Sequence, residues 1–260
     1  MKETIFKIIV LAFLLGSFFS NTLSQINTEN LYRTVPDSGL SFNAALNAVI
    51  SRGNTEFSSL DANARIDYIA DHYTIFTVGN IGYREGNERK IAHRGFAHIR
   101  YIHSISSWLS AESFVQKQFD AFTNLLDRNL FGLGARMFII DQNIDSTGFA
   151  QRFMVGIGVM YENELLRVPQ GYETEIPRST NYLNYSLTIS DGPVISAIAY
   201  YQPSLTYKND WRALTTASVT FPLYKALSFI SSLNYSFDNE PPQGIGKYDL
   251  EFSNGLRLAF

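Results

Sequence analysis

The chain has 260 residues with 21 basic and 24 acidic side chains, and it contains no cysteine. It therefore cannot be a disulfide scaffold, and a formal net charge of −3 does not suit a nucleic-acid-binding protein, which carries a basic surface. Its 20 Phe and 15 Tyr accompany only 17% charged residues. Such an aromatic load suits a barrel whose outer wall and interfacial girdles face lipid.

The first 24 residues have the composition of a secretory signal peptide. Lys2 and Lys7 precede an apolar run over residues 8–19, and small residues suited to cleavage follow near Ser24. That run is shorter than the roughly 20 residues that a membrane-spanning helix needs. We therefore expect a signal peptide over residues 1–24, a periplasmic lead-in over residues 25–39 and an outer-membrane barrel over residues 40–260.

From residue 40 onward, apolar and polar residues alternate in short segments separated by turn signals. A period of two places alternate side chains on opposite faces of a strand. The expected strands cover residues 40–50, 60–68, 72–84, 92–103, 107–121, 128–141, 152–162, 183–189, 194–202, 211–221, 226–237 and 248–260. This pattern predicts an all-β fold, an antiparallel up-and-down transmembrane β-barrel of about 12 strands with both ends on the periplasmic side.

The connections of such a barrel are short on one side and long on the other. Asp191-Gly192 predicts a tight hairpin turn. The long connections are expected over residues 163–178 and 238–247, on the extracellular side. In the strand over residues 152–162, Gly156 and Gly158 have the inward parity, and glycine there makes room in a crowded interior.

Residues 111–131 have two interpretations. Gly132 and Gly134, just beyond this stretch, would weaken a helix, and both flanks are strands, which favours strand–turn–strand. The alternative is an amphipathic helix, because apolar residues recur at roughly helical spacing. These residues are Val115, Phe119, Phe122 and Leu126.

The last expected strand, residues 248–260, alternates apolar and polar side chains and ends on Phe260. Apolar residues at every second position before a final Phe look like the closing strand of a bacterial outer-membrane barrel. That resemblance implies that Leu256, Leu258 and Phe260 form the signal read by the barrel-assembly machinery. We also expect this strand to pair with the first strand, near Leu40.

Several short stretches together resemble one protein family, the YdiY-like, salt-induced outer-membrane proteins known as domain of unknown function 481. They are Ser51-Arg52-Gly53-Asn54-Thr55, Phe96-Ala97-His98-Ile99-Arg100-Tyr101, Glu112-Ser113-Phe114-Val115-Gln116, Leu126 with Arg128, Leu130, Gly132 and Gly134-Ala135-Arg136, and Tyr200-Tyr201-Gln202-Pro203 with Asp210-Trp211-Arg212. The resemblance covers about residues 40–260. It implies location in the bacterial outer membrane, with its lipid as a partner, and supplies no catalytic residues.

Polar residues gather on the inward parity of the fourth to seventh expected strands. They are His98, Arg100, Glu112, Gln116, Gln118, Asp120, Arg136 and Glu162. Charges in a barrel interior are expected to pair, because an unpaired buried ion is costly. This favours a narrow passive channel or a structural envelope component with an ion-paired lumen. The alternative is an enzyme acting on envelope lipid or glycan, with His98 and Glu112 as general acid and base.

Other kinds of site find little support in the sequence. A lipid hydrolase needs a hydroxyl nucleophile beside a His on the lipid-facing side, whereas His98 has the inward parity. Gly132-Leu133-Gly134 lies on an expected strand and does not precede a helix, as a phosphate-binding loop would. The four His show no metal-ligand spacing. We expect no catalytic residues, no metal, no cofactor and no nucleic-acid partner, and the sequence does not identify a solute.

Overall fold

The computed structural model describes residues 38–52, 56–86, 89–144, 148–167, 172–224, 226–242 and 244–258. The expected signal peptide over residues 1–24, the lead-in apart from its last two residues, and Phe260 lie outside the described residues. Within the described part of the chain, no helix is long and apolar enough to cross a membrane.

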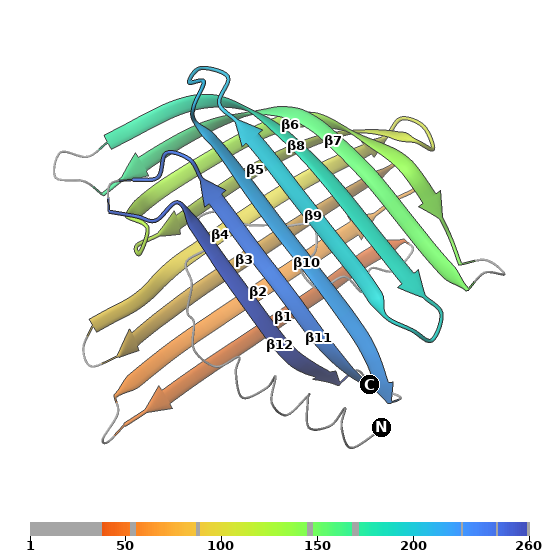
Figure 1. Cartoon of the computed structure of the whole chain (residues 1–260), viewed down its shortest axis with the longest axis horizontal. Helices are drawn as coiled ribbons and strands as arrows, with labels where there is room; N and C mark the ends of the chain where they lie inside the picture. Colours follow the sequence, from red (N-terminus) through yellow and green to blue (C-terminus); the bar gives the residue numbers. More distant parts are fainter. Residues whose placement is uncertain are drawn as a thin grey trace.

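The described residues form one antiparallel sheet of twelve strands, in which each strand pairs with its neighbours in sequence (Figure 1). The strands are β1 (Gly39–Ser51), β2 (Phe57–Ile69), β3 (Tyr73–Gly86), β4 (Arg89–Ser104), β5 (Leu109–Asp120), β6 (Leu125–Gln142), β7 (Phe149–Leu166), β8 (Tyr172–Ile189), β9 (Val194–Pro203), β10 (Trp211–Tyr224), β11 (Leu227–Asp238) and β12 (Tyr248–Leu258). The all-β, up-and-down prediction and the number of strands are confirmed. A turn joins β5 to β6, so the helix considered for residues 111–131 is wrong.

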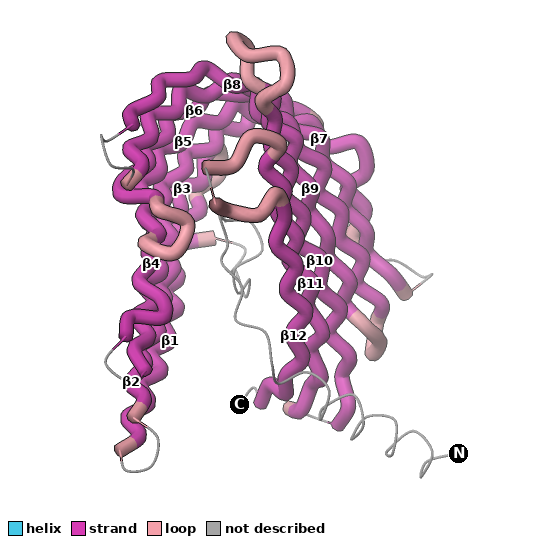
Figure 2. The backbone as a smooth tube through the Cα atoms, turned by 60° about the vertical axis from the view of Figure 1, so that its left-hand side comes forward, coloured by secondary structure: helices cyan, strands magenta, loops and turns pink. Residues whose placement is uncertain are grey.

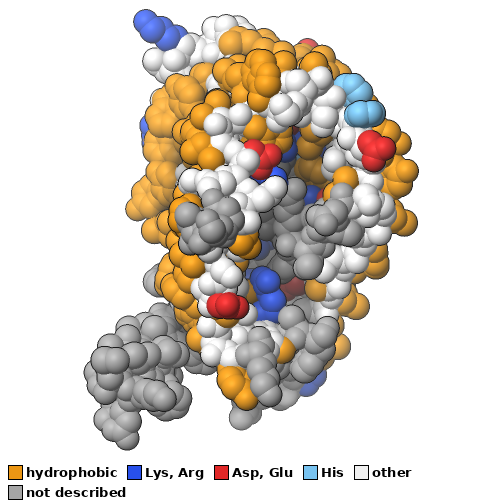
Figure 3. All heavy atoms as spheres, turned by 90° about the vertical axis from the view of Figure 1, so that its right-hand side faces the viewer, with side chains coloured by type: hydrophobic (Ala, Val, Ile, Leu, Met, Phe, Trp, Pro, Cys, Tyr) orange, Lys and Arg blue, Asp and Glu red, His pale blue; other side chains and the backbone are white. Residues whose placement is uncertain are grey.

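The sheet curves around an interior (Figure 2). Its two faces differ in chemistry. Large apolar side chains point outward at alternate positions, as at Ile99, Leu133 and Ile157, which are 47%, 51% and 53% exposed. The residues between them face inward and include buried arginines and carboxylates. Figure 3 shows hydrophobic side chains over much of the outer wall and charged side chains inside a hollow.

Two turn predictions can be compared with the structure. The Asp191-Gly192 hairpin is confirmed, because Asp191 has a positive φ of 54° and the Gly192 N–H donates to the Ile189 carbonyl at 3.0 Å. The long connection expected over residues 163–178 is wrong, because β7 continues to Leu166 and β8 already begins at Tyr172.

Pro177 lies within β8, although proline cannot donate to a sheet ladder. In the structure it pairs with Tyr161 on β7, and its carbonyl accepts the Leu205 N–H at 2.8 Å on the opposite side. The N–H and C=O of a residue in an antiparallel strand point to the same side. An N–H at position 177 would therefore point to the same side as this carbonyl, away from β7 and beyond the end of β9. Its absence in Pro177 removes no hydrogen bond to β7.

The expected pairing of the first and last strands is not seen among the described residues, where β1 and β12 are the two ends of the sheet (Figure 2). β1 is exposed on both faces along nearly its whole length. Its inward side chains, such as Asn43, Ala45 and Asn47, are small. Among the described residues, no packed interior side chains therefore hold β1 against β12.

Candidate functional site in the barrel interior

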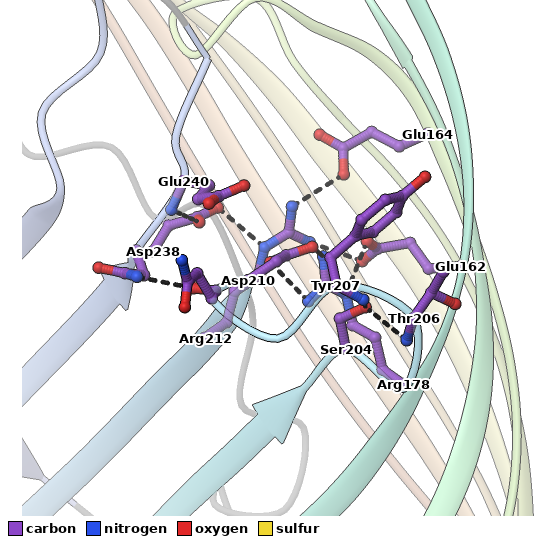
Figure 4. A network of polar contacts seen from close by, with 12 residues as sticks. Glu162, Glu164, Arg178, Ser204, Thr206, Tyr207, Asp210, Arg212, Asp238 and Glu240 are labelled. Atoms are coloured by element: carbon purple, nitrogen blue, oxygen red, sulfur yellow. Dashed lines mark hydrogen bonds and ion pairs between the residues drawn. The ribbon is translucent and has the colours of Figure 1, made fainter.

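Seven charged side chains form one network in the interior, which we call the Glu162 network. Figure 4 labels all of its members except Arg128. Its members come from β6, β7, β8, β10, β11 and the connection between β9 and β10, and all are buried. They are Arg128, Glu162, Glu164, Arg178, Asp210, Arg212 and Asp238. These residues supply three positive and four negative formal charges. Each arginine contacts more than one carboxylate.

Glu162, which is only 1% exposed, lies at the centre of this network. Its Oε1 accepts from Arg178 Nε at 2.9 Å, and its Oε2 accepts from Arg212 Nη1 at 2.6 Å. Neighbouring strands lie about 4.8 Å apart, so the three steps from β7 to β10 cover about 14 Å along the sheet. The contact between Glu162 and Arg212 therefore crosses the interior of the curved sheet.

Arg178 is fully buried and forms a two-pronged pair with Asp210, with its Nη1 and Nη2 donating to the two carboxylate oxygens at 2.8 and 2.7 Å. This geometry gives strong, directional hydrogen bonds. A local turn holds Asp210 in place. The Ser204 Oγ accepts the N–H groups of Thr206 and Tyr207 at 3.1 and 2.9 Å, and the Asp210 N–H donates to the Tyr207 carbonyl (Figure 4).

Arg212 joins the remaining carboxylates to this centre. Its Nε donates to Asp238 at 2.8 Å, and its Nη2 donates to Glu164 at 3.1 Å. Glu164 in turn accepts from Arg128 Nη2 at 2.9 Å. Three strands, β7, β10 and β11, are thus tied together by one guanidinium and the carboxylates around it.

A second group, the Glu112 cluster, consists of Glu112 on β5, Arg136 on β6, Tyr182 on β8 and Arg100 on β4. Glu112 Oε2 accepts from Arg136 Nη2 at 3.0 Å and from the Tyr182 hydroxyl at 3.1 Å, and Arg100 lies 3.6 Å away. The same Tyr182 oxygen accepts from Arg136 Nε at 2.7 Å. Tyr182 reaches β5 from three strands away, so this cluster also crosses the interior.

Glycine on neighbouring strands makes room for the aromatic rings of the interior. A Cβ added to Gly156 would lie 2.0 Å from the Tyr182 ring, and one added to Gly132 would lie 2.3 Å from the Phe114 ring. A Cβ added to Gly134 or Gly158 would instead lie 2.8 or 2.6 Å from a backbone carbonyl oxygen of the neighbouring strand. The prediction that inward glycine makes space in this part of the barrel is confirmed.

His98 lies in an aromatic stack and not in a catalytic arrangement. Its ring is stacked between Phe76 and Phe114, with centroids 5.9 and 5.5 Å away, and its Nδ1 lies 2.9 Å from Gln116 Oε1. The Arg100 guanidinium lies 5.1 Å from the Phe114 centroid. Glu112, the expected acid–base partner of His98, accepts hydrogen bonds from Arg136 and Tyr182. This geometry favours a packing role for His98.

The eight inward polar residues expected from the sequence are all buried but separate into groups. Arg100, Glu112 and Arg136 meet in the Glu112 cluster, and Glu162 belongs to the other network. Gln116 bonds to His98 and donates to Gln118, and Asp120 lines a cavity. Of the expected assembly residues, Leu256 is exposed on β12, whereas the Leu258 side chain and Phe260 lie outside the described residues.

Sequence reasoning missed six members of the Glu162 network: Arg128, Glu164, Arg178, Asp210, Arg212 and Asp238. Glu164 and Arg178 fell in the expected loop over residues 163–178. The others lay outside the inventory of inward polar residues. Asp210 and Arg212 stand in one of the stretches that carried the family resemblance, which is the signal that could have found them.

The interior also holds a cavity of about 780 Å³, which is lined by residues of β1 to β5 and β7 to β12, none of them a member of either group. Among the residues that the structure describes, no group of three or more His, Asp or Glu is arranged to hold a metal ion. The interior therefore combines two ion-paired groups that cross it with a cavity that polar and apolar side chains line together.

Comparisons with known proteins give one family match. The family model described as "Protein of unknown function, DUF481" matches residues 44–260. No curated protein matches the chain. Among solved structures, OmpT (in-vitro folded), an outer membrane protein of Vibrio cholerae, is 11% identical with a TM-score of 0.26, covering 85% of this chain and 95% of that chain. A TM-score this low carries no argument about the present chain.

Proposed function

Since the chain belongs to the DUF481 family, whose description names no activity, we propose its function from the interior: it is an outer-membrane β-barrel that acts as a narrow passive channel for small polar solutes. The signal peptide over residues 1–24 would direct the chain across the inner membrane. The apolar side chains of Leu256, Leu258 and Phe260 would present the last strand to the barrel-assembly machinery.

The outer wall supports the membrane location. Exposed apolar side chains recur at every second position on many neighbouring strands, as at Leu60, Val115, Val159 and Leu183. Contiguous apolar surface of this extent is rare on soluble monomers, whereas a lipid-facing wall requires it. Charged side chains are concentrated on the opposite, inward face, as expected for a barrel with a polar lumen.

The observation that carries the proposal is the contact between Glu162 and Arg212 across the interior. Barrels of about 8 strands are filled by side chains, whereas barrels of 16 or more leave an aqueous channel, so twelve strands fall between these cases. Here the charged side chains fill one part of the lumen and leave a cavity of about 780 Å³ beside them. A constricted channel fits this arrangement.

Planar-bilayer recording of the purified protein tests the proposal, together with variants Arg100→Ala and Arg136→Ala. We expect small conductance steps from the native protein and larger ones from the variants, because both side chains extend into the lumen. Folded protein that conducts in none of the three forms would contradict the channel and favour a structural envelope component. Recovery in the soluble periplasmic fraction, without heat-modifiable gel mobility, would contradict the membrane location.

A further inference from the structure

A row of serines crosses the inner wall of the sheet. Five serines from five consecutive strands, β8 to β12, lie in direct register with one another. They are Ser186, Ser196, Ser218, Ser232 and Ser253. All five line the cavity of about 780 Å³. At this level, the inner face of these five strands is therefore a continuous line of small hydroxyl groups.

Uncharged polar groups continue from the serine row onto the rest of the cavity wall. Within the row, the hydroxyls of Ser196 and Ser218 are 2.8 Å apart, and in the next row Thr216 donates to Asn234 at 2.9 Å. Opposing amides come from Asn63 and Asn80, which are register partners on β2 and β3 and also line the cavity. The wall thus offers many neutral donors and acceptors.

Four arginines and two carboxylates line the cavity. Two of these arginines are paired with carboxylates outside the lining, because Arg65 bonds to Asp67 at 2.6 Å and Arg152 bonds to Asp141 at 2.7 Å. The other charged side chains of the lining are two arginines and two carboxylates, Arg94, Arg257, Asp120 and Glu251. Counted with the two outside partners, positive and negative charges are equal in number, so the wall and its ion-pair partners carry no net formal charge.

One buried carboxylate oxygen on this wall accepts no hydrogen bond from the described part of the chain. Asp120 is 3% exposed, and its Oδ1 accepts the Phe122 N–H at 2.9 Å. Its Oδ2 is buried and has no hydrogen-bond partner among the residues that the structure describes. A buried carboxylate oxygen is costly to leave unsatisfied. Asp120 lies on the inward parity of β5 and lines the cavity, so a ligand in the cavity can supply the missing donor.

We propose that this cavity binds an uncharged polyhydroxylated solute, a short saccharide, whose hydroxyls bond to the serine row and to Asp120. Saccharide hydroxyls donate and accept in many directions, which matches a wall of hydroxyls and amides. Ligand sites commonly have volumes of about 300–1,000 Å³, so the cavity has room for a short saccharide. The inference rests on the proposed channel only for the route by which solute enters.

The test is binding of maltose to the detergent-solubilised full chain, measured by saturation-transfer difference NMR. Maltobionate, which is similar in size but carries a carboxylate, is the comparison probe. We expect saturable maltose binding and at least tenfold weaker binding of maltobionate, because its carboxylate would lose its hydration against a wall of neutral hydroxyls and amides and would be repelled by Asp120. Absence of saturable maltose binding, or equal binding of both probes, would overturn the inference.

Two pairs of variants locate the site. Ser218→Leu fills the middle of the serine row, whereas its control Val219→Leu changes the opposite face of β10. Asp120→Asn keeps an oxygen for the Phe122 N–H but removes the carboxylate, and its control is Asp127→Asn, whose carboxylate bonds to the exposed Lys117 at 2.8 Å. We expect Asp120→Asn to weaken maltose binding about tenfold, the value of one charge-assisted hydrogen bond. Ser218→Leu should weaken it at least as much, because the larger side chain occupies the site, and each control should leave it unchanged.

The outcomes separate this inference from the proposed function. Folding of each variant is checked by heat-modifiable gel mobility, and Asp120→Asn keeps the test decisive if Ser218→Leu does not fold. Maltose binding unaffected by both interior variants would overturn the site. Conductance without maltose binding would reject the saccharide site and leave the channel intact, whereas maltose binding without conductance would support the site and reject the channel.

Discussion

Arg178→Met is expected to be among the most destabilising single substitutions in the interior. It removes three donated hydrogen bonds, one to Glu162 and two to Asp210, at 2.7–2.9 Å. The Glu162 network then holds two positive and four negative formal charges, and Asp210 loses its two-pronged partner. Removing one member of a buried ion pair costs about 3–5 kcal/mol, because the other charge stays buried and uncompensated.

Glu162→Gln is the matched comparison within the same network. It also removes a central charge, but three positive and three negative charges remain. The amide oxygen can still accept one of the bonds from Arg178 or Arg212. We therefore expect a smaller loss of about 1–3 kcal/mol, in the range for charge-assisted hydrogen bonds.

Urea unfolding of both variants in lipid vesicles measures these two losses, with the folded fraction read from heat-modifiable gel mobility. The charge balance of the network predicts that Arg178→Met loses more free energy of unfolding than Glu162→Gln. An equal or greater loss for Glu162→Gln would refute this reasoning. The local contacts of Glu162, and not the total charge of the network, would then determine the loss in free energy of unfolding.

Three further substitutions test the packing of the barrel. Gly156→Ala places a Cβ 2.0 Å from the Tyr182 ring and should cost at least about 1–3 kcal/mol, whereas Gly255→Ala meets no atom within 4 Å and should be neutral in the same urea titration. Tyr182→Phe removes the hydroxyl shared by Glu112 and Arg136 and should cost about 1–3 kcal/mol by that titration; an unchanged midpoint would show that the hydroxyl contributes nothing. Ile157→Arg puts a charge on the outer wall and should cost about 2–4 kcal/mol in vesicles if this wall is near the bilayer midplane, so a fully stable variant would contradict lipid contact.

The local sequence was sufficient to predict the strands and several of their details. Alternation places Ile157 outward, and a missing side chain at Gly156 leaves room for a neighbour's ring. Asp191-Gly192 specifies its own hairpin. In each case the determining residues are close in sequence, or the period of the strand fixes which face a side chain occupies.

The networks could not be predicted in this way, because their partners are far apart in sequence. Glu162 meets Arg212 from fifty residues away, and that contact depends on how far the whole sheet curves. Arg178 lies in the stretch expected to be a loop, directly after Pro177, which cannot donate to a sheet ladder. Only the end of β9, a tertiary feature, explains why a proline is tolerated at that position.

The most direct test of the central claim is the single-channel conductance of the double variant Glu162→Ala/Arg212→Ala. Removing this pair takes away one positive and one negative charge together with the contact across the lumen. Folded protein of this variant should conduct in larger steps than the native protein in the same salt, because the constriction is wider. A conductance equal to or below the native value, in a variant with native heat-modifiable mobility, would contradict the claim that the Glu162 network narrows the channel.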